Sequence, residues 1–300
     1  MQSLRWLIVW LALGLGLQAN DLQELRVLTW NLNWFPGAAR GVPTSPDQEA
    51  SRIAAVAAAL RQASADVVIL QEVRDAAACR ALAVALQPQR YELSICSQFK
   101  DFGGMPGLQQ LAILSKHPAA RAVAVRWSSF GVADPPRGFV HALYQIGNCA
   151  LLVYGVHLKS NLTQGDVLRD RQLNMLKREL AADQLLQHQR EQARHLSQAV
   201  VVVVGGDFNT NADQEEFLSE QTLALFHQAQ FRSGFEGLAR EARVTLPGSG
   251  RHADATFDYL FVKPAEAAGA PWMVTSEASD HRPVLRSLKL PAVPTPGRSP

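Results

Sequence analysis

Short apolar runs rich in β-branched residues recur along the chain and predict nine β-strands. The valine run at 200–204 has no polar alternation, which predicts a strand buried on both faces. Gly147-Asn148 separates two of the runs and is a turn signal, so these two strands are expected to form a hairpin. The predicted strands are residues 26–33, 66–73, 91–97, 110–115, 141–146, 150–159, 199–205, 256–262 and 281–288.

Helical patterns are fewer, and they lie unevenly between the strands. Ser45-Pro46-Asp47-Gln48 has the residue types of a capped helix start and precedes an alanine-rich stretch. Hairpins in the middle and at the end of the chain disfavour a purely parallel, doubly wound sheet. The pattern favours an α+β fold of two packed mixed sheets with helices on their outer faces. The predicted helices are residues 49–62, 75–86 and 166–195, with a short one near 213–220.

The two ends of the chain differ in composition from the rest. An apolar run at 6–17 follows Arg5 and precedes Gln18-Ala19-Asn20, which is the layout of a secretory signal peptide. We therefore expect residues 1–19 to be a signal peptide and the protein to be exported to the periplasm or secreted. Leu17 is not the small residue preferred before a cleavage site, so an uncleaved anchor or a buried first helix remains an alternative.

The remainder is expected to fold as one domain over residues 25–290, followed by a disordered tail at 291–300. The hydrophobic content of 47% and the charged content of 19% indicate a globular protein and exclude a disordered one. We expect a monomer with no stable membrane span in its mature form. The formal net charge is only +2, so any basic footprint for nucleic acid has to be local.

The three cysteines, Cys79, Cys96 and Cys149, have no CxxC or Cys/His spacing, which disfavours a zinc site. Cys79 is near the start of a predicted helix, and Cys96 is near the end of the following strand. An exported protein can keep a disulfide, and Cys79–Cys96 is the preferred pair.

Polar residues stand at the ends of five predicted strands. Singly each has an ordinary explanation: Glu72 as a solvated strand end, Asp207 as a helix cap, His157 as a half-buried histidine. Gly205-Gly206, before Asp207, would let the backbone approach a ligand closely. Five such strand ends on one rim of a sandwich would form a polar cleft on a rigid scaffold. The residues are Asn31, Asn33, Glu72, His157, Asp207, Asn209, Asp280 and His281.

The residue types in this cleft indicate the chemistry. Carboxylates and amide oxygens suit Mg²⁺, Mn²⁺ or Ca²⁺ rather than zinc. The two histidines can transfer protons near neutral pH. No activated serine or cysteine motif is evident, so direct attack by water is favoured over a covalent intermediate. Metal-dependent hydrolysis of a phosphate ester fits this set.

Five segments resemble, in order, the motifs of the endonuclease/exonuclease/phosphatase superfamily. They are TWNLN at 29–33, LQEV at 70–73, GVHL at 155–158, GDFN at 206–209 and SDHRP at 279–283. This superfamily includes pancreatic deoxyribonuclease, abasic-site endonucleases, neutral sphingomyelinases and inositol-polyphosphate 5-phosphatases. The resemblance covers nearly the whole mature chain and implies a four-layer α/β/β/α sandwich.

The resemblance also implies a role for each residue. Glu72 would be the principal metal ligand, with Asn31 and Asp280 beside it. Asp207 would orient the attack or the leaving group. Asn31, Asn33 and Asn209 would contact the phosphate. Asp280 would polarise His281, which would act as general base or bind phosphate. His157 would act as general acid, and Asp258 matches the acid that the family has on this strand.

Two of the predicted phosphate or substrate contacts have strong alternatives. Lys159 shares the face of His157 only if its strand continues, and it is otherwise a solvated residue. Asp258 is alternatively a hydrogen-bonding group at the edge of the core.

The substrate does not follow from these motifs. The loops 98–109 and 127–138 carry aromatic residues together with Lys100, Arg126 and Arg137. Such loops can stack on bases or touch a lipid interface. A nuclease-like phosphodiesterase is favoured. The alternatives are a phospholipid or phosphoinositide phosphodiesterase or phosphatase, and a catalytically silent binding protein on the same fold.

Overall fold

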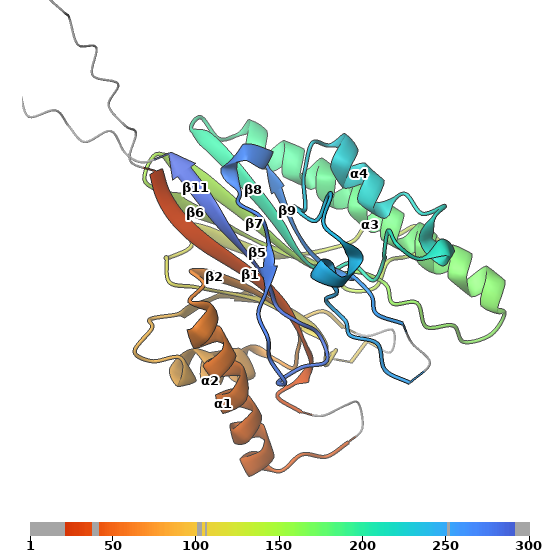
Figure 1. The fold of residues 1–300 in the computed structure, drawn as a ribbon, viewed down its shortest axis with the longest axis horizontal. Helices are drawn as coiled ribbons and strands as arrows, with labels where there is room; N and C mark the ends of the chain where they lie inside the picture. The colour runs from red at the N-terminus through yellow and green to blue at the C-terminus, as the bar shows by residue number, and fades with distance from the viewer. Residues whose placement is uncertain (1–21, 38–41, 101–103, 106, 251–252, 292–300) are drawn as a thin grey trace, which may run out of the picture.

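The computed structural model describes residues 22–37, 42–100, 104–105, 107–250 and 253–291. The predicted signal peptide lies outside these residues, as does the predicted tail apart from Pro291. Two mixed sheets pack face to face, and helices cover their outer faces (Figure 1). This is the α/β/β/α sandwich expected from the sequence. No helix of the described residues is both long enough and apolar enough to span a membrane.

The first sheet has six strands in the order β10-β11-β1-β2-β4-β3. Only the central pair, β1 and β2, runs parallel, and the other neighbours are antiparallel. The helices α1 (Pro46–Ala63) and α2 (Ala76–Ala85) cover its outer face. Its strands are β1 (Leu22–Phe35), β2 (Val67–Val73), β3 (Glu92–Cys96), β4 (Gln110–Ser115), β10 (Trp272–Met273) and β11 (Val284–Pro291).

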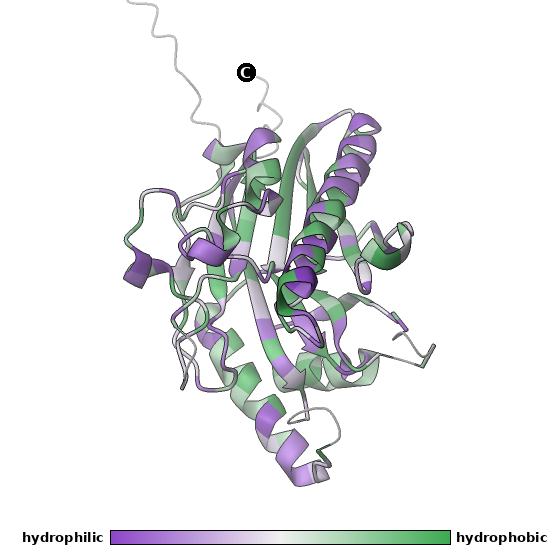
Figure 2. Ribbon diagram, turned by 90° about the vertical axis from the view of Figure 1, so that its right-hand side faces the viewer, coloured by the Kyte–Doolittle hydropathy of each residue, from purple (hydrophilic) through white to green (hydrophobic). Residues whose placement is uncertain are grey.

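The second sheet has five strands in the order β5-β6-β7-β8-β9, with β7 and β8 parallel. The long helix α3 (Val167–Arg194) and the short helix α4 (Thr222–Gln228) cover its outer face. Figure 2 shows α3 with alternating hydrophilic and hydrophobic positions, whereas the sheet strands are mainly hydrophobic. The strands are β5 (Arg121–Arg126), β6 (Gly138–Ile146), β7 (Cys149–His157), β8 (Ala199–Asp207) and β9 (Asp258–Lys263).

Strand alternation divides the interior into two apolar clusters. On β1, Leu25 and Val27 belong to the cluster between the sheets, whereas Leu28 and Trp30 face α1 and α2. All four side chains are essentially buried. The central strands are therefore apolar on both faces, which is why their sequences show few polar positions until each strand ends.

Most of the predicted elements are present, but three details differ. The sequence analysis did not predict β5, a half-exposed edge strand, or the two-residue strand β10. The helix predicted near 213–220 is wrong: only Glu215–Phe217 forms a 3-10 turn, and the helix α4 begins at Thr222. Between these two elements, Glu220 is buried in an ion pair with Arg178 of α3.

The glycine pair before Asp207 makes room for protein rather than for a ligand, contrary to the expectation from the sequence. A Cβ on Gly205 would lie 2.7 Å from side-chain atoms of Ile69, which is on the facing sheet. Gly206 has φ +155°, and a Cβ there would lie 2.0 Å from the Val156 carbonyl oxygen on β7. Both glycines therefore permit the close packing that places Asp207.

Candidate active site

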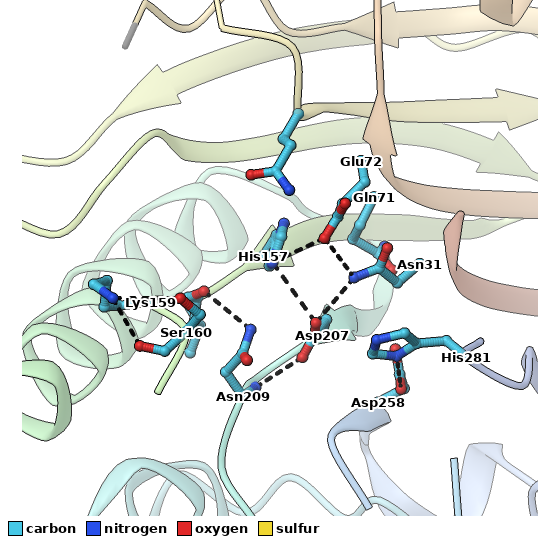
Figure 3. A network of polar contacts seen from close by, with 12 residues as sticks. Asn31, Gln71, Glu72, His157, Lys159, Ser160, Asp207, Asn209, Asp258 and His281 are labelled. Atoms are coloured by element: carbon cyan, nitrogen blue, oxygen red, sulfur yellow. Dashed lines mark hydrogen bonds and ion pairs between the residues drawn. The ribbon is translucent and has the colours of Figure 1, made fainter. Parts of the chain in front are cut away.

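Three chemically active side chains form a row across the second sheet. The strand register pairs His157 at the end of β7 with Asp207 at the end of β8, and Asp207 with Asp258 at the start of β9. Residues aligned in this way project from the same face of a sheet. Each of the three is buried. His157 Nε2 lies 3.6 Å from Asp207 Oδ2 (Figure 3).

The first sheet contributes Asn31 and Glu72 to the same place. The Asn31 side-chain amide donates to Glu72 Oε1 at 3.2 Å and to Asp207 Oδ2 at 3.0 Å, so it bridges the two sheets. Glu72 Oε1 also lies 3.8 Å from His157 Nε2. The predicted residues Asn31, Glu72, His157 and Asp207 therefore meet in one cluster, although they come from four different strands (Figure 3).

Glu72 reaches this position because the β1–β2 pairing is irregular. The register shifts between Asn31 and Phe35 on β1, and Glu72 has a left-handed backbone with φ 58°. Such a bulge redirects one side chain out of the regular alternation. The Trp34 backbone N–H then donates to Glu72 Oε2 at 3.1 Å, which fixes the carboxylate.

Left-handed backbone conformations are concentrated around the site. Asn33, Trp34 and Asn209 have φ values of 45°, 63° and 52°. Each such residue costs about 1–3 kcal/mol and persists only where the surrounding structure enforces it. Arg52 on α1 supplies part of that enforcement, because its guanidinium donates to the carbonyl oxygens of Leu32 and Asn33.

His281 completes the cluster from the loop before β11. Its Nδ1 lies 2.8 Å from Asp258 Oδ2, so its carboxylate partner is Asp258. The resemblance had implied Asp280 in this role. The Trp30 indole donates to the His281 carbonyl oxygen at 2.8 Å and anchors this loop on the first sheet. Asp258 is fully buried behind the ring, whereas Asp280 is exposed on the open side.

Asn209 lies beside Asp207 and is held by its neighbours. Its backbone N–H donates to Asp207 Oδ1 at 2.9 Å, and its side-chain amide donates to the Leu158 carbonyl oxygen at 3.3 Å. The Asn161 side chain donates in turn to the Asn209 carbonyl oxygen. Both ends of the Asn209 residue are thus fixed next to the row of acids.

Lys159 does not share the face of His157, because β7 ends at His157. The Lys159 ammonium turns back and donates to the Ser160 carbonyl oxygen at 2.8 Å (Figure 3). Burial, followed by the nearby charges of Lys177, Arg137 and Arg178, lowers the pKa of Lys159 to about 8.

The electrostatics of the cluster follow from burial and from which charges meet. Burial and the neighbouring Asp258 charge raise the pKa of Asp207 to about 7. Burial would lower the pKa of His281, but the Asp258 charge and hydrogen bond outweigh it and raise that pKa to about 10. Burial, with the charges of Arg137, His281 and Lys159, places the pKa of His157 well below its usual value.

The donor set fits a hard divalent cation. Ligand atoms of Asp207, Asp258 and His281 all lie within 4.8 Å of one another. Asp258 Oδ1 is buried without a hydrogen-bond partner. Burial lowers the pKa of Arg52, and the charges of Asp280 and Glu72 partly offset this, so both carboxylates act electrostatically on the same guanidinium. Carboxylate and amide oxygens of this kind suit Mg²⁺, Mn²⁺ or Ca²⁺.

Three further residues support the cluster, and the sequence predicted only one of them, Arg137, as part of a substrate-contacting loop. Arg52 and Trp34 fix the Asn33 backbone and the Glu72 carboxylate. Arg137 Nη2 donates to the His157 carbonyl oxygen at 2.9 Å. None has a local signal, since each acts through a partner that is distant in the chain.

The predicted disulfide is not formed, since Cys79, Cys96 and Cys149 are all free thiols in the structure. The expected proximity is present, however. Helix α2 packs against β3, and the Cys79 and Cys96 thiols lie close enough to shift each other's pKa, that of Cys79 upward and that of Cys96 downward.

Comparison with known proteins agrees with this geometry. A sequence profile described as the endonuclease/exonuclease/phosphatase family matches residues 28–281. The fold and the match together define the class: the chain belongs to the endonuclease/exonuclease/phosphatase family. Members of this family hydrolyse phosphoester bonds. A search of curated proteins found no match to the chain.

Solved structures show the same fold at low sequence identity. A family protein from Beutenbergia cavernae has a TM-score of 0.63 at 21% identity, with coverage of 91% of this chain and 73% of that one. One from Bacteroides vulgatus also has a TM-score of 0.63, at 15% identity, with coverage of 89% and 99%. Truncated TDP2 from Caenorhabditis elegans has a TM-score of 0.60 at 18% identity, covering 89% and 97%.

Proposed function

We propose that this protein is a divalent-metal-dependent, nuclease-like phosphodiesterase that hydrolyses its substrate by direct attack of water. One observation carries the proposal: Asn31 and Glu72 of one sheet meet Asp207 and His157 of the other within hydrogen-bonding or ion-pairing distance. A folded protein gains little from gathering buried acids in this way, so the cluster is expected to act on a ligand.

The residues that would hold the cation are Glu72, Asn31 and Asp280. In the Asp207, Asp258 and His281 group, one Asp258 oxygen already contacts the His281 ring at 2.8 Å, so we assign this group to orienting His281 rather than to holding the ion. A divalent cation held by Glu72, Asn31 and Asp280 would neutralise the phosphate and polarise its ester bond.

The other residues have complementary tasks. Asp207, held by Asn31 and by the Asn209 backbone, is placed to orient the attacking water and accept its proton. His281, oriented by Asp258, would donate to a non-bridging phosphate oxygen. Asn209 would contact the phosphate, and His157 closes the side of the cleft next to Glu72.

The test uses purified protein and bis(p-nitrophenyl) phosphate with Mg²⁺ or Mn²⁺. We expect metal-dependent release of p-nitrophenolate that is lost in Asp207→Asn. Asp183→Asn, an exposed acid on α3, is the matched control and should keep full activity. Failure of the wild type to cleave any phosphoester with any divalent metal would refute the enzyme function. It would favour the silent binding protein instead.

A panel of plasmid DNA, RNA, sphingomyelin and phosphoinositides then tests the substrate class. Cleavage of a nucleic acid is the expected result. Preferential cleavage of a phospholipid or phosphoinositide would favour the alternative function.

We also propose that the protein is an exported monomer with residues 1–19 removed. The proposal rests on the apolar run at 6–17 after Arg5 and on Gln18-Ala19-Asn20. Mass spectrometry of the exported protein should show a mature N-terminus near Asn20. An intact N-terminus would contradict the proposed cleavage.

A further inference from the structure

A cavity of about 590 Å³ lies beside the proposed catalytic cluster. The loop between β3 and β4 and the loop between β5 and β6 provide most of its lining, and Trp34 provides one side. Its volume is within the range of about 300–1,000 Å³ that small-ligand sites have. None of the roles proposed above uses this cavity.

The walls of the cavity are held by specific hydrogen bonds. The Gln110 side chain donates to the carbonyl oxygens of Phe99 and Gly107 and accepts from the Phe99 N–H, which fixes the β3–β4 loop. The Phe99 ring lies against Gly138. A Cβ added to Gly138 would be 2.7 Å from the Phe99 Cζ. A side chain at position 138 would therefore displace this wall.

Trp127 is held on the opposite loop. Its indole N–H donates to the Pro136 carbonyl oxygen at 3.0 Å, and its ring centroid lies 5.0 Å from that of Phe139. The indole is only half-buried, so part of it remains available to a ligand. A fixed, partly exposed indole loses little conformational entropy when a flat group stacks on it.

The described residues of the lining carry mainly positive charge. Lys100 and Arg126 are exposed at the cavity, and Arg137 is half-buried in its wall. Asp134 is the only carboxylate among the described lining residues, and it already accepts hydrogen bonds from the Ser129 hydroxyl and the Phe130 backbone N–H. The described lining thus combines aromatic faces with an excess of cations, which complements a flat group attached to a phosphate.

The cavity is connected to the catalytic cluster through two of its lining residues. The Trp34 backbone N–H donates to Glu72 Oε2, the proposed metal ligand, at 3.1 Å. Arg137 donates to the His157 and Leu158 carbonyl oxygens at 2.9 Å and 3.2 Å. A phosphodiester held at Glu72 would therefore have one of its two ester groups next to the cavity.

We propose that this cavity binds the base of the nucleotide on one side of the scissile phosphate, with the base against Trp127. The proposal rests on the proposed phosphodiesterase function and names the substrate class for the same site. An acyl chain would need a continuous apolar lining, whereas Gln109, Ser128 and Arg137 place polar groups in this one. A base can use both the aromatic faces and the polar groups.

The test compares the dinucleotide thymidylyl-thymidine with two analogues in which a tetrahydrofuran residue replaces one nucleoside or the other. These substrates differ only in the base, so the chemical step is unchanged. We expect the wild type to prefer the full dinucleotide over one analogue by about 10-fold or more in kcat/KM, mainly through KM. Equal kcat/KM for all three substrates would overturn the proposal.

Variants locate the effect in the cavity. Trp127→Leu keeps an apolar contact for Phe139 but removes the stacking surface, so the preference for the full dinucleotide over the abasic analogue should fall to near unity. Trp272→Leu removes an exposed indole outside the cavity and should keep the preference. A preference that survives in Trp127→Leu would refute the assignment of the base to this cavity.

A separate measurement distinguishes this proposal from the proposed function. If no dinucleotide is cleaved, calorimetry can still measure binding of thymidylyl-thymidine to the wild type and to Trp127→Leu. Binding that weakens about 10-fold in the variant supports the cavity assignment even without hydrolysis. Absence of binding, or tighter binding of a short-chain phospholipid, overturns it.

Discussion

His281 and His141 are both buried, yet their surroundings shift the pKa of the two imidazoles in opposite directions. His281 at the proposed catalytic cluster is 8% exposed and contacts Asp258. His141 on β6 is 1% exposed and packs against Tyr154 and His188 below α3, with ring centroids 5.4 Å and 4.9 Å away. The pKa of His281 is raised to about 10, whereas that of His141 is lowered to about 4.

The difference shows that the partner, rather than burial, decides the charge. Burial lowers the pKa of both histidines, but only His281 has a buried carboxylate in contact with it. His188 and Arg121 lower the pKa of His141 further. The His141, Tyr154 and His188 rings pack against one another without a carboxylate partner for His141 among the described residues, so we call them the histidine cluster and interpret them as core packing.

The carboxylates at the catalytic cluster have histidines, and not lysine or arginine, as their ion-pair partners among the described residues. These carboxylates are those of Glu72, Asp207 and Asp258. Buried acids in this arrangement destabilise the fold unless a ligand compensates for them. We therefore expect changes in the catalytic cluster to affect activity most, and changes in the histidine cluster to affect stability most.

The largest expected effect comes from metal removal. Dialysis against EDTA should reduce phosphodiesterase activity to background, and added Mg²⁺ or Mn²⁺ should restore it, because the clustered acids would bind the cation. Circular dichroism should be unchanged throughout. Activity that persists after chelation would show that the acids have another purpose.

Asp207→Asn should lower kcat by about 1,000-fold or more, because Asp207 is the proposed acceptor for the proton of the attacking water. The melting temperature should not fall, since the variant removes one of two neighbouring buried acids. A large loss of stability would show instead that Asp207 is needed for folding. Asp183→Asn serves again as the control.

His281→Gln should lower kcat by about 100-fold. Asp258→Asn should have a smaller effect, about 10-fold, because Asp258 acts only by positioning the His281 ring. The double variant should be no worse than His281→Gln alone. Additive losses would show that Asp258 has a task independent of His281, and a kcat and KM analysis would separate the two cases.

The histidine cluster should affect stability but not catalysis. His141 has a lower pKa folded than its ordinary value of 6.5, so the unfolded chain binds more protons between pH 6.5 and about 4. The neutral His141 therefore contributes to the free energy of unfolding in full above pH 6.5. This contribution, on the order of 3 kcal/mol, is lost as the pH falls towards about 4. His141→Gln should flatten this part of a urea-unfolding profile and leave kcat within about 2-fold. A loss of activity would break the contrast between the clusters.

Much of the site was predictable because its signals are local. Asn31, Glu72, His157 and Asp207 each follow an apolar strand, and a buried strand leaves few positions for polar residues except at its end. By contrast, β5 was missed because an edge strand is only half-buried and its pattern is correspondingly weak. Lys159 was misplaced because the exact end of a strand depends on its neighbours.

The layered fold and the types of side chain at the strand ends could be predicted from the amino-acid sequence, since strand periodicity and polarity are properties of short segments. Three contacts became known only from the folded chain: His281 pairs with Asp258 rather than Asp280, Asn31 bridges to Asp207 across 176 positions, and Trp127 lines a cavity beside Glu72. These contacts depend on sheet order, register and loop packing. No local pattern encodes them, because the residues involved are neighbours only after the two sheets have packed together.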